Sequence, residues 1–282
     1  MRATFLGVST VLLDDGETAL LTDGFFSRPS FLRITLGRLR PDPPRIDAAL
    51  RRAGIERLAA VLVAHSHYDH ALDAPVVAQR TGALLVGSPS TRQIGAGYGF
   101  PLDRFVEAPV TQPLRLGGFT VTAFESPHSY PDRYPGTIDE PVTLPARVSS
   151  YRTGACYSFH IGHAEGSVLV HASAEFRPGL LAGQRADTVY LGVGQLGRRD
   201  EAFLADYWRE VVEAVRPRRV VPIHWDFFTR PLEPGVRPFP WPFDNFRRTM
   251  AFLAGACDAA GIELAPAQPW AVRDPFARSG RG

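Results

Sequence analysis

The stretch of sequence that decides the fold is residues 58–70, LAAVLVAHSHYDH. Its first six residues form a continuous apolar run, which is typical of a β-strand buried on both faces. His65, His67, Asp69 and His70 follow directly after that strand. Because loops at the ends of buried strands carry the functional groups of open α/β sheets, this order predicts an α/β fold with a site at the end of this strand.

These four residues are ligand types that transition metals prefer. Neutral imidazole binds zinc, iron, copper or nickel, and a carboxylate compensates part of the charge. His65 and His67 are two positions apart after a strand, so both rings can point to one side. A single histidine is usually a satisfied core or surface residue, but four such groups left unpaired at the exit of an apolar strand would be costly. The cluster therefore indicates a metal centre.

The hexapeptide at residues 65–70 resembles the His-x-His-x-Asp-His signature of the metallo-β-lactamase superfamily. The strand opening at residues 6–10 and the turn at residues 22–24 resemble the segments that precede the signature in that family. The two later histidines of the family are matched by His128 and His224.

This resemblance covers residues 3–255 and implies a fold and a ligand set. The implied fold is an α/β fold of the αββα sandwich type, in which two mixed β-sheets are flanked by helices and the metals lie between the edges of the sheets. The ligands implied for one metal are His65, His67 and His128, and those implied for a second are Asp69, His70 and His224.

One position departs from the family pattern. The family usually has an aspartate after a mid-chain strand that bridges the two metals, and Ser173 stands at that position. A neutral serine cannot bridge two cations as a carboxylate does, so we expect one tight metal and a second that is weak or absent. His171 and Glu175 lie on the same side of the chain as Ser173 and are candidate replacements. Zinc is the expected metal, with manganese or iron as alternatives.

The chemistry implied by the resemblance is hydrolysis by a metal-activated water. Asp69 is the candidate catalytic residue, because it would either ligate the second metal or orient or deprotonate the attacking water. The branch that the chain resembles contains ascorbate-6-phosphate lactonase and the phospholipase D that hydrolyses N-acyl-phosphatidylethanolamine, which favours an ester, lactone or phosphodiester bond. The alternatives are an iron-dependent oxidoreductase on the same fold and a non-catalytic member that binds a metal or ligand.

Aromatic residues in three long loops indicate a pocket for an apolar substrate body, unless these rings only pack the loops onto the domain. The loops are residues 24–44, 129–151 and 226–246. The candidate pocket residues are Trp225, Asp226 and Phe228.

The bulk composition limits the partners. A net charge of +2 gives no reason to expect a nucleic acid, and no apolar run is long enough to span a membrane. We therefore expect a cytoplasmic protein with a small-molecule substrate, and a homo-oligomer stays open. Cys156 and Cys257 are expected to be buried thiols, and His160 and His163 to be core or surface histidines outside the site.

The remaining pattern predicts one domain over residues 1–282, with residues 268–282 as a loose tail. Residues 24–44 are expected to be loop and residues 95–99 a turn. Predicted helices begin after Asp200 and Asp244. The other predicted elements are strands at 3–6, 9–13, 19–22, 83–86, 119–125, 155–161, 167–171, 188–191 and 219–223, and helices at 46–53 and 72–81.

Overall fold

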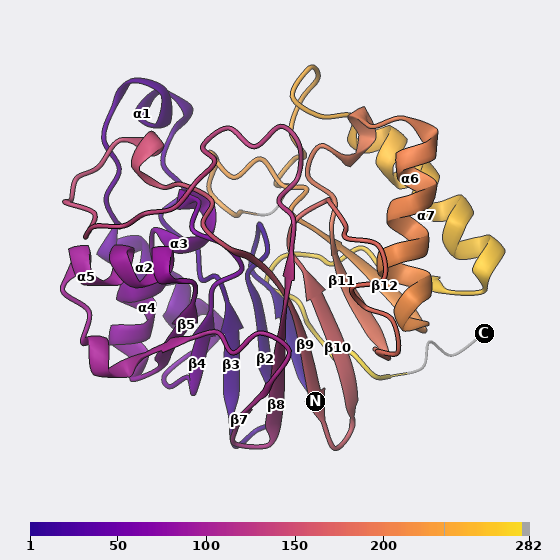
Figure 1. Ribbon diagram of the computed structural model, residues 1–282, viewed down its shortest axis with the longest axis horizontal. Coiled ribbons are helices and arrows are strands. Elements are labelled where there is room, and N and C mark those ends of the chain that lie inside the picture. The colour runs from indigo at the N-terminus through magenta and orange to yellow at the C-terminus, as the bar shows by residue number, and fades with distance from the viewer. Residues whose placement is uncertain (234, 278–282) are drawn as a thin grey trace.

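Two seven-stranded β-sheets form the middle of the molecule, and helices cover the outer face of each (Figure 1). The computed structural model describes residues 1–233 and 235–277. Helices α2, α4 and α5 lie on the left of Figure 1, and α6 and α7 lie on the right. This arrangement confirms the predicted αββα sandwich.

The first sheet has the order β14-β1-β2-β3-β4-β5-β6. Strands β1 to β3 form an antiparallel meander, β14 pairs antiparallel with β1, and β3 to β6 run parallel. The strands are β1 (Arg2–Phe5), β2 (Val11–Asp14), β3 (Ala19–Thr22), β4 (Ala60–Leu62), β5 (Leu84–Gly87), β6 (Phe105–Glu107) and β14 (Val272–Arg273).

The second sheet has the order β13-β12-β11-β10-β9-β8-β7. Strands β7 to β10 are antiparallel, and β10 to β13 are parallel. The strands are β7 (Pro113–Leu116), β8 (Phe119–Ser126), β9 (Cys156–His163), β10 (Gly166–His171), β11 (Thr188–Gly192), β12 (Arg219–Ile223) and β13 (Glu263–Leu264).

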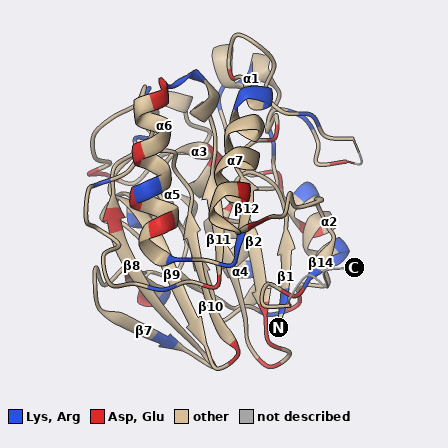
Figure 2. Ribbon diagram, turned by 90° about the vertical axis from the view of Figure 1, so that its right-hand side faces the viewer, with Lys and Arg blue, Asp and Glu red and all other residues tan. Residues whose placement is uncertain are grey.

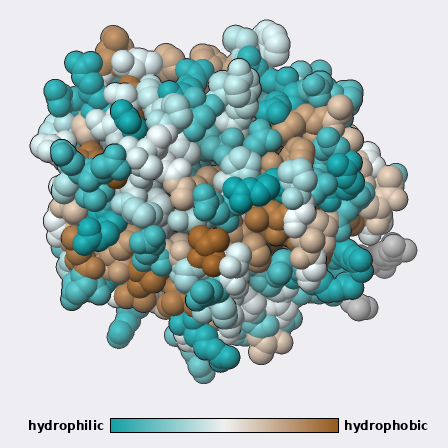
Figure 3. All heavy atoms as spheres, viewed as in Figure 1, coloured by the Kyte–Doolittle hydropathy of each residue, from teal (hydrophilic) through white to brown (hydrophobic). Residues whose placement is uncertain are grey.

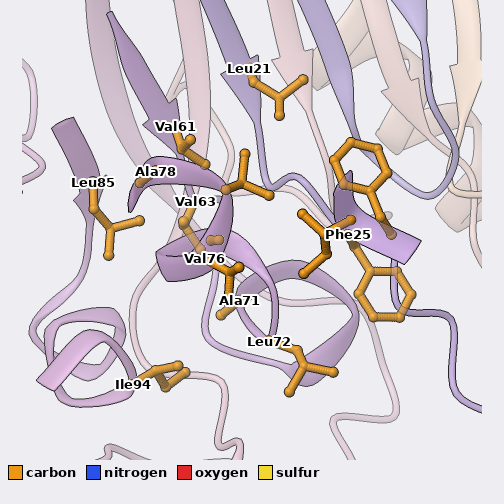
Figure 4. Packing of buried hydrophobic residues seen from close by; sticks show 14 of the residues in the cluster. Leu21, Phe25, Val61, Val63, Ala71, Leu72, Val76, Ala78, Leu85 and Ile94 are labelled. Atoms are coloured by element: carbon orange, nitrogen blue, oxygen red, sulfur yellow. The ribbon is translucent and has the colours of Figure 1, made fainter. Parts of the chain in front are cut away.

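Strand β4 shows why its apolar run is needed. Ala60 and Leu62 face the core between the two sheets, whereas Val61 and Val63 face the helices on the outside of the first sheet. Figure 4 shows Val61 and Val63 beside Val76 of the neighbouring helix α4. Both faces of the strand are therefore buried, as the run predicts.

Helices α1 to α5 accompany the first sheet, and capping residues define the ends of α2 and α4. Asp42 caps the N-terminus of α2, and Gly54 ends this helix in the left-handed conformation at φ 67°. Gly82 ends α4 in the same way, at φ 73°. The helices are α1 (Phe31–Leu36), α2 (Pro43–Ala53), α3 (Tyr68–Ala71), α4 (Ala74–Thr81) and α5 (Pro89–Tyr98).

Helices α6 (Glu201–Tyr207) and α7 (Phe246–Ala260) cover the second sheet and face the viewer in Figure 2. Asp200 caps α6 as predicted, and the chain continues into a π-helical turn at Trp208–Val212. Charged residues in Figure 2 are scattered and mixed in sign, and apolar residues in Figure 3 show in separate groups among hydrophilic ones. No helix in the described part of the chain combines the length and apolar character needed to cross a membrane.

Several local predictions were wrong. The segment 24–44 contains α1, a helix with no buried residue and therefore no apolar pattern to reveal it. Gly95 and Gly97 belong to α5, and Gly99 ends this helix in the left-handed conformation at φ 84°. A Cβ on Gly97 would lie 2.0 Å from the carbonyl oxygen of Val142, so the close approach of that segment requires glycine there. Helix α7 is capped by Asn245 rather than Asp244.

Residues 268–277, which were expected to belong to a loose tail, pack onto the domain. Strand β14 pairs with β1, so it has a backbone partner, and the Trp270 indole donates to the carbonyl of Leu232 at 2.8 Å. Residues 278–282 lie outside the described residues. Cys156 and Cys257 are both buried and free, as predicted.

Candidate metal centre

All six predicted ligand residues lie just after the carboxyl ends of three strands. His65 to His70 follow β4, His128 follows β8, and His224 follows β12 directly. Helix α3, which begins within the motif, lies toward the end of the sandwich opposite the N-terminus (Figure 1).

The six residues form two groups, and within each group the donor atoms lie within 4.8 Å of one another. The first cluster is His65, His67 and His128, and the second cluster is Asp69, His70 and His224.

The first cluster consists of three imidazole rings whose centroids are 4.6 to 4.9 Å apart. Both ring nitrogens of His65 and the Nδ1 of His128 are buried without a hydrogen-bond partner. Burial lowers the pKa of His128 to about 3, and burial with neighbouring histidines lowers the pKa of His65 well below its usual value. Neutral rings keep a lone pair, and unpartnered buried nitrogens are costly, so this geometry fits a cation.

The second cluster is buried more deeply and contains a carboxylate. The Nε2 atoms of His70 and His224 are 3.2 Å apart, and the Asp69 Oδ2 lies 3.6 Å from the first and 3.4 Å from the second. Burial opposes ionisation of Asp69, but His70 and His224 outweigh it and hold its pKa below the usual range. Burial likewise opposes the charge on His224, but Asp69 raises its pKa. These three donors also fit one cation.

Asp23 is a candidate positioning residue that the sequence analysis does not identify. Its Oδ2 lies 2.8 Å from His70 Nδ1 and also accepts from the Ser9 hydroxyl, while its Oδ1 accepts from the Ala64 amide at 2.7 Å. A carboxylate at Nδ1 fixes the ring and leaves Nε2 free for a metal. The turn at residues 22–24 was visible in the sequence, but this role was not.

Asp132 is a second residue that was missed. It lies in the loop after β8, with Oδ1 3.4 Å from His67 Nε2 and Oδ2 4.0 Å from His128 Nδ1. The carboxylate also accepts a hydrogen bond from the Thr153 hydroxyl.

The suggested replacements for the bridging aspartate are occupied elsewhere. The His171 Nδ1 lies 2.7 Å from the Ser158 hydroxyl and its Nε2 lies 2.8 Å from the carbonyl oxygen of Glu175, so His171 offers no free nitrogen. Glu175 pairs with Arg199 at 3.2 Å. The Ser173 hydroxyl accepts from the amide of Ser129, the residue that follows His128, at 2.8 Å.

Of the three candidate pocket residues, Phe228 lies beside the clusters, with its ring centroid 5.7 Å from that of His224. Trp225 packs away from them, stacked between Phe5 and Phe246. Asp226 is fully buried and ion-paired with Arg28, so the prediction that it lines a pocket was wrong.

His160 and His163 lie outside both clusters, as predicted. The Nε2 of His160 is 2.6 Å from the carbonyl oxygen of Arg185, and the Nε2 of His163 is 3.4 Å from Asp15.

Comparison with known proteins places the chain in a family. Residues 18–225 match the family model described as the beta-lactamase superfamily domain. Because this match spans more than half of the chain, and the site holds the histidine and aspartate groups of the metallo branch, the protein belongs to the metallo-β-lactamase superfamily.

The similar proteins include one relative and two solved structures. A protein named a metal-dependent hydrolase from Pyrobaculum calidifontis is 29% identical over 235 residues, covering 81% of this chain and 85% of its own length. Igni18, a metallo hydrolase from Ignicoccus hospitalis, has a TM-score of 0.60 at 17% identity and covers 96% of this chain and 97% of its own. CmlA, a diiron β-hydroxylase from Streptomyces venezuelae, also has a TM-score of 0.60, at 18% identity, covering 96% of this chain and 53% of its own. At these identities the two structures show the shared fold.

Proposed function

We propose that this protein is a metal-dependent hydrolase that opens an ester, lactone or phosphodiester bond in a small molecule. The observation that carries the proposal is the convergence of six metal-binding side chains in two clusters, with unpartnered buried nitrogens in the first. The name of the relative from Pyrobaculum calidifontis supports the reaction class. The residues that would hold metal are His65, His67 and His128 in the first cluster and Asp69, His70 and His224 in the second.

A divalent metal bound here would lower the pKa of its water to about 7 and polarise a carbonyl or phosphoryl oxygen. Asp69 stays ionised, because the neighbouring histidines hold its pKa low. Its carboxylate can therefore accept a hydrogen bond from the attacking water and orient it, which is the catalytic role we propose for this residue.

The aromatic residues beside the second cluster favour a substrate with an apolar body. Phe228 packs edge-on against Phe25, Tyr68 and Phe239, with ring centroids 4.8 to 6.5 Å apart. Phe25 is fully buried and serves the core, whereas Phe228 is half-buried and is the ring we propose to contact substrate. Such a wall excludes water from one side of the reacting bond.

The test is metal content by plasma mass spectrometry on protein purified without added metal, followed by assays on ester, lactone and phosphodiester substrates. We expect zinc or manganese and activity in at least one assay. His67→Ala should lose both metal and activity, while His160→Ala, a histidine outside the clusters, should keep both.

Full activity of His67→Ala would refute the site. Iron in the purified protein would favour an oxidoreductase. Metal without any hydrolytic activity would favour a binding protein.

A further inference from the structure

The loop between β8 and β9 brings a carboxylate to the first cluster. Asp132 lies four residues after His128, and its side chain is 24% exposed. Among the described residues, Asp132 is the one carboxylate within 4.0 Å of a ring nitrogen of the first cluster: it lies 3.4 Å from His67 and 4.0 Å from His128. The geometry therefore links one acid to two of the three rings.

Thr153 connects this carboxylate to His67 and is held firmly by its backbone. The Thr153 amide donates to the carbonyl of Tyr134 at 2.9 Å, and its carbonyl accepts from the amide of Ser66 at 2.9 Å. The hydroxyl of Thr153 lies 3.1 Å from His67 Nε2 and also contacts Asp132 Oδ2. Thr153 is thus fixed between the metal-binding motif and the loop that carries Asp132.

Counting hydrogens shows which nitrogen of His67 faces the metal. The Thr153 hydroxyl has one hydrogen and two oxygen acceptors beside it, the carboxylate of Asp132 and, at 3.1 Å, the carbonyl of Tyr134, of which the carboxylate is the stronger. At His67 Nε2 the hydroxyl oxygen therefore accepts, which requires a hydrogen on that nitrogen. In a neutral ring the lone pair is then on Nδ1, and this is the atom that His67 offers to a metal.

The charge balance of the first cluster also points to Asp132. The first cluster contains three imidazole rings and no carboxylate, and Ser173 brings no charge to the family's bridging position. A divalent cation bound by three neutral ligands gains from a negative charge nearby. Asp132 supplies one at 3.4 Å from His67 and 4.0 Å from His128.

We infer that Asp132, acting with Thr153, is a positioning residue of the first cluster that fixes His67 with Nδ1 free for the metal and supplies the charge that Ser173 does not. This inference rests on the proposed metal centre. Asp132 does not touch the reacting atoms in this scheme. Its effect is on metal affinity and ring orientation.

The experiment measures zinc affinity of each cluster by competition with a chelator. Partners that orient metal-binding histidines typically change affinity 10- to 100-fold. Asp132→Asn and Thr153→Val should weaken zinc binding at the first cluster by about this factor and leave zinc binding at the second unchanged. Thr153→Ser, which keeps the hydroxyl, should bind zinc at the first cluster as tightly as the wild type. Asp139→Asn, an exposed aspartate of the same loop, is the control.

A second measurement reports the ring directly. In zinc-loaded protein labelled with ¹⁵N-histidine, two-bond proton–nitrogen NMR spectra should show metal on Nδ1 of His67 and hydrogen on Nε2. Metal on Nε2, or Asp132→Asn matching Asp139→Asn in affinity, would overturn the inference alone. Wild-type protein that binds no metal would overturn the proposed function as well.

Discussion

The two clusters differ in how a bound cation would be balanced. The second cluster has Asp69 among its donors and Asp23 behind His70, and both carboxylates are buried. The first cluster has three imidazole rings and no carboxylate among its donors, with the partly exposed Asp132 beside them. Attraction between charges is stronger where water is excluded, so we expect the second cluster to bind metal more tightly. The sequence alone suggests the opposite ranking. Ser173 stands where the family has the bridging aspartate, and the loss of that carboxylate would weaken the second metal.

The largest expected effect is on metal-linked stability. A metal present at about 1,000 times its dissociation constant stabilises the folded state by about 4 kcal/mol, and chelation removes this amount. Asp69→Asn should lose most of the increase in unfolding free energy that zinc gives, whereas His128→Gln should lose a smaller part. The measurement is denaturant unfolding of each variant with and without zinc.

The unfolding free energy of each variant is compared with and without zinc, so a loss of stability that the substitution itself causes cancels. Equal losses in the two variants would mean that the clusters bind as one unit. A greater loss in His128→Gln would reverse the ranking of the two sites.

A pH effect of about 3 kcal/mol is expected from Asp73, which ties the loop at Phe26 and Ser27 to the N-terminus of helix α4. Its carboxylate accepts from the amides of Phe26 and Ser27 and from the Ser27 hydroxyl. Burial outweighs these hydrogen bonds and raises the pKa of Asp73 from 3.8 to about 6. A raised folded pKa gives stability that is complete below about pH 4 and is lost as the pH rises through 6, at about 1.4 kcal/mol for each pH unit that separates the folded and unfolded pKa values.

Unfolding measured from pH 4 to 7.5 in the presence of chelator tests this sign. Asp73→Asn mimics the protonated acid and should show less loss of stability over that range than the wild type. Identical pH profiles would contradict the assignment.

What the sequence could predict was local. Side chains of the apolar run at β4 point alternately into two hydrophobic cores, and the ligand motif follows the run directly. The strand and the first four ligand residues could therefore be predicted from residues 58–70 alone. The start of helix α6 after Asp200 is likewise read from neighbouring residues.

What could not be predicted depends on contacts that only the fold creates. Asp23 is 47 residues from His70, and Thr153 is 86 residues from His67. Nothing in the neighbouring sequence distinguishes Asp132 from the exposed Asp139 of the same loop. Asp226 shows the opposite error, because it stands close to a ligand residue in sequence but is used by Arg28 in the interior.

The carboxylate behind His70 gives the next prediction. Asp23→Asn should weaken zinc binding at the second cluster about 10- to 100-fold, because His70 loses the charged acceptor that orients it. The amide oxygen can still accept from Ala64, so the fold should hold. Chelator competition should show the mirror image of Asp132→Asn, with one variant weakening each cluster. If Asp23→Asn weakened zinc binding at the first cluster instead, each carboxylate would not be serving only the cluster beside it.

The smallest expected effect is at the bridging position itself. Ser173 is only 5% exposed, and the amide of Ser129, the residue that follows His128, already donates to its hydroxyl. In Ser173→Asp the new carboxylate can accept that hydrogen bond and adds one negative charge, which should tighten zinc binding at the first cluster roughly tenfold, about 1.4 kcal/mol. Ser173→Asn, which has the same size without the charge, is the control. If both variants bind zinc equally well, charge is not what limits the first cluster, and the contrast between the two sites lies in how their rings are held.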